Sequence, residues 1–171
     1  MLSTDEKARA VCEAMGLHAG VAWVGMVIRG EREEGPGEVA GYAAVLRVGE
    51  VRGPGWWCAY IGLQPRFENA LRQLDVHGGI SYTTVYGIPG CIKRQRRAWM
   101  PEGLSWVGWD YAHQGDCTGL PGATTGRRWT LSEVVEAELK GAVAQLDLGA
   151  GYPARGIAGR VVSPEEWRHG R

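Results

Sequence analysis

Glycine limits the fold of this chain more than any other residue type, because it supplies 27 of the 171 residues. Glycine adopts the backbone conformations of tight turns that other residues avoid. Such a composition favours short strands joined by turns and loops over a bundle of long helices. The chain also has 8 Trp against a single Phe. We expect most of these large, flat side chains to pack in the core.

Apolar and β-favouring runs of strand length recur along the chain between its two ends. They predict strands at residues 21–28, 41–48, 56–62 and 105–109, with a further β-favouring run inside 77–86. The stretch 65–74 is predicted to be a loop or a short helix.

Helical patterns mark both ends of this β-rich region. Residues 4–15 combine N-terminal capping residues with an apolar stripe, and Gly16 is placed to end that helix. Thr130-Leu-Ser-Glu133 has the pattern of a capping box, and apolar residues follow it at helical spacing as far as Leu146. The sequence therefore predicts an α+β fold, with a small antiparallel or mixed sheet flanked by N- and C-terminal helices. We predict one globular domain at residues 1–148 and a Gly/Pro/Arg-rich C-terminal tail at residues 149–171.

Composition argues against several classes of protein. The 19 basic and 19 acidic residues balance, so no global field gathers nucleic acid or an anionic membrane. No apolar segment reaches the ~20 residues of a membrane-spanning helix, and the acidic N-terminus differs from a signal peptide. Four widely spaced cysteines contain no Cys-x-x-Cys pair, which argues against a zinc ribbon or a dense disulfide framework. We therefore expect a cytoplasmic protein with reduced cysteines and no membrane partner.

Chemically useful side chains gather in two short polar segments, one around His77 and one that follows the strand at 105–109. In the second segment Asp110, His113 and Asp116 are three residues apart, so one helical turn or a tight loop brings them together. With His77 they supply two imidazoles and two carboxylates, a mixed ligand set that suits a divalent metal ion such as Zn²⁺, Mn²⁺, Fe²⁺ or Mg²⁺. Neutral histidine beside a carboxylate also serves as a general base. We predict these four residues as the catalytic set and as the metal ligands.

The same residues have a structural interpretation. An Asp after a strand often caps a turn. A buried His113 hydrogen-bonded to Asp110 would form part of a network that pins the sheet and carries no chemistry.

Further residues are candidates for binding a ligand. Gly78 and Gly79 would let the backbone approach a phosphate, although Gly-Gly is also common at turns and bulges. Tyr82 would line the same pocket. Four positive charges in the five residues 93–97 include Arg94 and Arg96, which we predict to bind an anionic ligand. A solvated loop is the simpler interpretation of this run. We expect a small-molecule or nucleotide-like ligand in preference to nucleic acid.

Three motifs in order resemble a family of small bacteriophage and prophage proteins of unknown function. The residues that carry the resemblance are Trp57–Gly62, Asp75–Tyr82 and Trp106–Asp116. The family pattern runs approximately Trp-Cys-Gly-Tyr-Val-Gly, Val-His-Gly-Gly-Leu-Thr-Tyr and Trp-Trp-Phe-Gly-Phe-Asp-Cys-Ala-His-x-Gly-Asp. The resemblance covers roughly residues 56–147 and implies a phage origin, the cytoplasm of a host cell and a shared site, but no reaction.

This sequence departs from the family pattern at two places. The family's Gly-His-Pro after the first motif is replaced by Gln64-Pro65-Arg66, and the Cys of the third motif is replaced by Tyr111. The second departure weakens any role for a cysteine as a metal ligand or nucleophile.

Two functions from different classes follow. The first is a metal-dependent hydrolase, in which a cation activates water for attack on a phosphoester or nucleotide-like substrate. The second is a non-catalytic phage accessory protein that sequesters a nucleotide ligand or inhibits a host protein. The sequence predicts neither the oligomeric state nor the host target.

Overall fold

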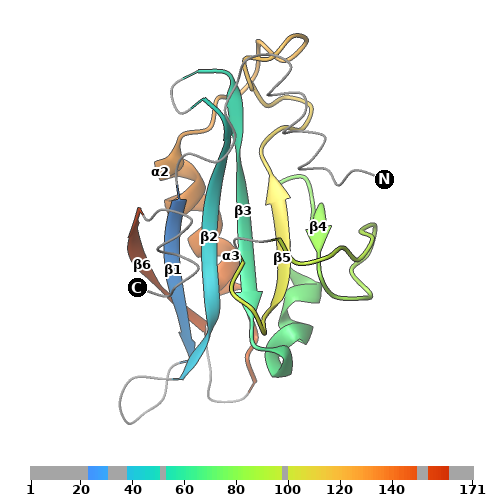
Figure 1. Ribbon diagram of the computed structural model, residues 1–171. Coiled ribbons are helices and arrows are strands. Elements are labelled where there is room, and N and C mark those ends of the chain that lie inside the picture. The colour runs from blue at the N-terminus through green and yellow to red at the C-terminus, as the bar shows by residue number, and fades with distance from the viewer. Residues whose placement is uncertain (1–22, 31–37, 51–52, 98–99, 150–153, 162–171) are drawn as a thin grey trace.

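The computed structural model describes residues 23–30, 38–50, 53–97, 100–149 and 154–161. Their centre is a six-stranded sheet in the order β4-β5-β3-β2-β1-β6, and every strand pairing in it is antiparallel (Figure 1). The strands are β1 (Trp23–Gly30), β2 (Val39–Gly49), β3 (Gly55–Leu63), β4 (Tyr82–Thr83), β5 (Ser105–Asp110) and β6 (Ala154–Val161). The predicted α+β class is confirmed, with an antiparallel sheet. The helix predicted at residues 4–15 lies outside the described residues.

Both faces of the sheet are covered at its centre, where every residue of β3 from Trp57 to Leu63 is buried. Alternate residues of a strand point to opposite faces. The face of the sheet that carries Ile61 packs against the helical segment near the C-terminus. The face that carries Tyr60 packs with Tyr82 and Trp106 in a second, smaller core. Of the five tryptophans whose burial the structure describes, four are buried: Trp57, Trp106, Trp109 and Trp129.

The helical segment that covers one face follows the predicted capping box. It comprises α2 (Leu131–Glu133), the π-helical turn η2 (Val134–Leu139) and α3 (Lys140–Ala144), and it lies behind β1 to β3 in Figure 1. The Thr130 hydroxyl accepts from the Glu133 amide, and the Glu133 carboxylate accepts from the Thr130 amide. Val134, Val135 and Leu139 are buried against the sheet. The predicted C-terminal helix is therefore confirmed, with a π-helical turn that its spacing did not indicate.

Two shorter features complete the fold. The stretch predicted as a loop or short helix forms the 3₁₀ helix η1 (Pro65–Gln73), which buries Ala70 and Leu71. Strand β6 lies in the stretch predicted as a tail, and it pairs with β1 at the edge of the sheet. Within the described part of the chain, no helix is both long enough and apolar enough to cross a membrane.

Candidate functional site

The second polar segment leaves the sheet at the end of β5 and straddles its two faces. Asp110 pairs with Cys58 in the register of β3 and β5, and both residues line a pocket on the face opposite the helical segment. Tyr111 belongs to the larger core on the helix side. Because neighbouring residues point to opposite faces, the loop places polar groups on both sides of the sheet edge.

Residues 110–116 form a tight loop, the second of the two conformations that the sequence allowed. The Asp110 carboxylate accepts from the Ala112 amide at 3.1 Å, and the His113 carbonyl accepts from the Asp116 amide at 2.9 Å. Gly115 turns the chain with φ at +94°, a conformation that favours glycine. The Arg127 amide donates to the Gly115 carbonyl at 2.8 Å. The loop is therefore hydrogen-bonded to the segment around Arg127.

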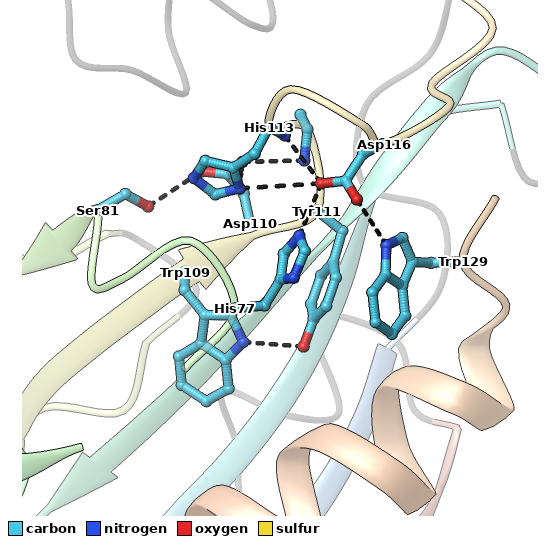
Figure 2. A network of polar contacts seen from close by, with 9 residues as sticks. His77, Ser81, Trp109, Asp110, Tyr111, His113, Asp116 and Trp129 are labelled. Atoms are coloured by element: carbon cyan, nitrogen blue, oxygen red, sulfur yellow. Dashed lines mark hydrogen bonds and ion pairs between the residues drawn. The ribbon is translucent and has the colours of Figure 1, made fainter. Parts of the chain in front are cut away.

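Asp116 is buried, and its carboxylate accepts three hydrogen bonds (Figure 2). Its Oδ2 accepts from His77 Nε2 at 2.8 Å and from the His113 amide at 2.9 Å. Its Oδ1 accepts from Trp129 Nε1 at 2.8 Å. Burial by itself raises the pKa of Asp116, but the bonds from His77, Trp129 and the His113 amide together hold that pKa below its usual value. Asp116 is therefore an ionised acceptor, and His77 carries the proton on Nε2.

His77 is held between aromatic rings. It stacks on Tyr111 with centroids 4.9 Å apart and an angle of 8° between the planes, and it meets the Trp129 ring edge-on at 5.0 Å. Tyr111 accepts a hydrogen bond from Trp109 Nε1 at 2.9 Å, and burial raises its pKa well above the ordinary value, so it is a neutral phenol. The imidazole is thus fixed in position by packing as well as by Asp116.

His113 lies directly over Gly78. A Cβ atom at Gly78 would lie 2.2 Å from His113 Cε1, so the ring occupies space that only glycine leaves free. The Nδ1 atom of His113 is buried and has no hydrogen-bond partner. It lies 3.6 Å from Asp110 Oδ1 and 3.9 Å from Asp116 Oδ2, beyond ordinary hydrogen-bond distance. A buried nitrogen between two carboxylates needs a partner, which a bound cation or a proton would provide.

His77, His113 and Asp116 form a group that could hold a metal ion, with one ligand atom from each lying within 4.8 Å of the others. The ligand atoms of a tetrahedral zinc ion bound at ~2.0–2.1 Å lie roughly 3.3 Å apart. The distances from Asp116 Oδ2 to the two histidine nitrogens, 2.8 Å and 3.9 Å, fall on either side of that value. A cation would replace the proton that His77 now shares with Asp116. The donor set and the unpartnered Nδ1 of His113 therefore fit a divalent cation.

A pocket of about 340 Å³ adjoins this group. His113 belongs to both features, because it lines the pocket while its Nδ1 faces Asp110 and Asp116. Ser81 also lines the pocket and donates to Asp110 Oδ2 at 3.0 Å. The lining residues are Trp56, Cys58, Tyr60, Ser81, Tyr82, Arg97, Trp109, Asp110, Ala112 and His113.

The structure brings together all four residues predicted to form the catalytic and metal set, although Asp110 stands beside the three-residue group and not within it. Gly78 supports His113, and Gly79 completes the turn by donating its amide to the Val76 carbonyl.

The predicted ligand-binding residues divide between the pocket and its surroundings. Tyr82 lines the pocket, but Arg94 and Arg96 do not. Arg96 pairs with Glu102 at 3.2 Å and donates to the Met100 carbonyl. In the same basic run, Arg97 is the residue that reaches the pocket.

Sequence reasoning missed several contributors, and two tryptophans are the clearest cases. Trp129 donates to Asp116, and Trp56 lines the pocket. The abundance of tryptophan is the signal that pointed to them, but it did not distinguish a site residue from a core residue. Comparison of the chain with protein-family models, with curated proteins and with solved structures gives no match.

Proposed function

We propose that this protein is a metal-dependent hydrolase that acts on a phosphoester, with a divalent cation held by His77, His113 and Asp116. The observation that carries the proposal is the Nδ1 atom of His113, which is buried, has no hydrogen-bond partner and lies beside the Asp116 carboxylate. His113 also lines a pocket of small-molecule size. The resemblance of the motifs to phage proteins adds the proposal that the enzyme acts in the cytoplasm of a host cell.

Each residue has a distinct part in this proposal. Bound at this site, a cation would polarise the phosphoryl oxygen and lower the pKa of a water molecule, which would attack phosphorus as the ester P–O bond breaks and the alcohol leaves. Before a cation binds, Asp116 holds the His77 ring and the backbone at His113 in place, through its bonds to His77 Nε2 and to the His113 amide. Asp110, which Ser81 and the Ala112 amide hold in place at the pocket wall, is positioned to accept a proton from the attacking water.

A second candidate function is a ligand-binding protein without turnover, such as one that sequesters a nucleotide. The observation that favours it is that the Asp116 carboxylate already accepts three hydrogen bonds, so its charge is stabilised without a cation. In this case the network would fix the pocket wall, and the pocket would retain its ligand unchanged.

Metal content distinguishes the two functions. The full chain would be equilibrated with Zn²⁺ or Mn²⁺, desalted and analysed by mass spectrometry, and assayed for hydrolysis of the monoester p-nitrophenyl phosphate and of the diester bis-p-nitrophenyl phosphate. We expect one bound cation per chain in the unaltered protein. Loss of an outer-shell partner typically lowers metal affinity by about 10- to 100-fold. Because His113 is a proposed ligand, we expect His113→Ala to lower metal affinity by more than that and to abolish hydrolysis.

Asp75→Asn is the matched control, because Asp75 is exposed and lies outside the site. It should leave metal content and hydrolysis unchanged. Absence of metal from the unaltered protein, or stoichiometric metal in the His113→Ala variant, would overturn the metal site. Unfolding curves of every variant are needed, because a purely structural network would lose stability and activity in proportion.

A further inference from the structure

Residues of β3 form one part of the pocket lining. Trp56, Cys58 and Tyr60 alternate along β3 and therefore share one face. Gly108 is the partner of Tyr60 on β5, and a Cβ there would lie 2.5 Å from Tyr60 Cδ1. The glycine thus lets the Tyr60 ring lie across β5, where it meets the Tyr82 ring edge-on at 5.9 Å.

Among the tyrosines and tryptophans of this lining, Trp56 is the least buried. Tyr60, Tyr82 and Trp109 are buried, with 2%, 5% and 1% of their surface exposed, whereas Trp56 is only partly buried. An indole at a pocket wall stacks well with a planar heterocycle, and such stacking tolerates any base because every base has a π-face.

A positive charge lies in the same pocket. The Arg97 guanidinium lies over the Tyr82 ring at 4.4 Å from its centroid, which holds it at the pocket wall. Guanidinium groups pair with phosphate through two parallel hydrogen bonds. Asp110 brings a negative charge to the lining, so the proposed cation would be needed to make the His113 side of the pocket attractive to phosphate.

We propose that this pocket binds a mononucleotide, with its base stacked on Trp56 and its phosphate drawn to Arg97 and to the cation beside His113. The inference rests on the proposed function and names its substrate class. The volume of about 340 Å³ lies at the lower end of the ~300–1,000 Å³ range of small-molecule sites. That size suits one nucleotide, and a chain whose charges balance has no global field that gathers a nucleic-acid strand.

The test is an equilibrium titration of the full chain with adenosine monophosphate in the presence of a chelator, so that no metal enters the measurement. Ribose 5-phosphate lacks the base, and adenosine lacks the phosphate. Adenosine monophosphate should bind more tightly than either. Trp56→Ala should weaken its binding by about fivefold or more and leave ribose 5-phosphate unaffected. Arg97→Gln should weaken both phosphates and leave adenosine unaffected.

Two further variants guard against unfolding and indirect effects. Trp56→Phe keeps an aromatic face and should retain most of the binding. Tyr86→Ala removes an aromatic ring that is 74% exposed and outside the pocket lining, and it should change nothing. Equal binding of adenosine monophosphate and ribose 5-phosphate would overturn the inference. Equal weakening of both by Trp56→Ala would overturn it as well.

The outcomes also separate this inference from the proposed hydrolase. If adenosine monophosphate binds as expected but the chain takes up no metal, the nucleotide site is supported and the hydrolase fails. If metal uptake and phosphoester hydrolysis depend on His113 while binding does not depend on Trp56, the hydrolase is supported and the nucleotide site fails.

Discussion

Asp116 is a buried carboxylate whose charge is balanced by donors from three separate parts of the chain. His77, the His113 amide and Trp129 supply those donors. Hydrogen bonds to a charged group stabilise more than neutral ones, and a buried donor or acceptor left without its partner is costly. Each donor therefore stabilises the fold and also orients Asp116, one of the candidate metal ligands.

Trp129→Phe tests that contribution, because it keeps an aromatic ring and removes the Nε1 donor. We expect the free energy of unfolding to fall by roughly 1–3 kcal/mol, measured by urea denaturation. Tyr86→Phe, a change at an exposed ring, is the control and should have no effect. An unchanged midpoint in Trp129→Phe would show that water replaces the lost donor.

Gly78 and Gly79 form a matched pair for testing the position of His113. Both have positive φ, +68° and +82°, so alanine is strained at either position. Only at Gly78 would the new Cβ meet the His113 ring, since nothing lies within 4 Å of a Cβ at Gly79. We expect Gly78→Ala to lower metal affinity by about tenfold or more, and Gly79→Ala to preserve it. Equal losses in a Zn²⁺ titration of the two variants would contradict this geometry.

Among the elements, the helical segment from α2 to α3 forms as its local sequence pattern predicts. The Thr130 capping box forms as its sequence predicts. Bonds from the Thr130 amide and hydroxyl hold the pKa of Glu133 below its usual value. A lowered carboxyl pKa in the folded state stabilises the fold above the ordinary glutamate pKa, and this stabilisation disappears as the pH falls through the lowered value.

Glu133→Gln should therefore lower the thermal midpoint near neutral pH, and its difference from the unaltered protein should shrink as the pH falls below about 4.5. Thermal melts between neutral and acidic pH provide the measurement. Ser132→Ala, at an exposed neighbouring position, should keep the pH dependence of the unaltered protein. A constant difference at every pH would exclude the charge of Glu133 as the cause.

At the scale of the whole molecule, β6 decides whether β1 is an inner or an edge strand. It pairs with β1 from Arg29 and Gly30 at one end to Val24 at the other. Without it, the unpaired amide and carbonyl groups of β1 would be a template for association with another chain.

Deletion of residues 150–171 is the corresponding test. We expect a lower urea midpoint and a concentration-dependent increase in size by light scattering. Deletion of residues 162–171 alone, which retains β6, should show neither effect. A shortened chain ending at residue 149 that remained monomeric and equally stable would indicate that the domain ends near residue 148, as its sequence predicts.

The sequence by itself determined what depends on neighbours a few residues apart. The positions of the central strands, the capping box and the two polar segments all follow from local spacing, because side-chain alternation and backbone capping are short-range effects. The polar segments at His77 and at residues 110–116 were recognisable as candidate sites because their polar residues lie close together in the sequence.

Only the tertiary structure decided which polar groups meet. His77 and Asp116 are 39 positions apart in the chain and share a hydrogen bond, because the loop after β5 and the turn before β4 converge at one sheet edge. The register that pairs Cys58 with Asp110 sets the pocket beside them. It is likewise the fold that brings Arg97, and not Arg94 or Arg96, to that pocket. These contacts depend on strand register and loop closure over long separations, which no local pattern of residues encodes.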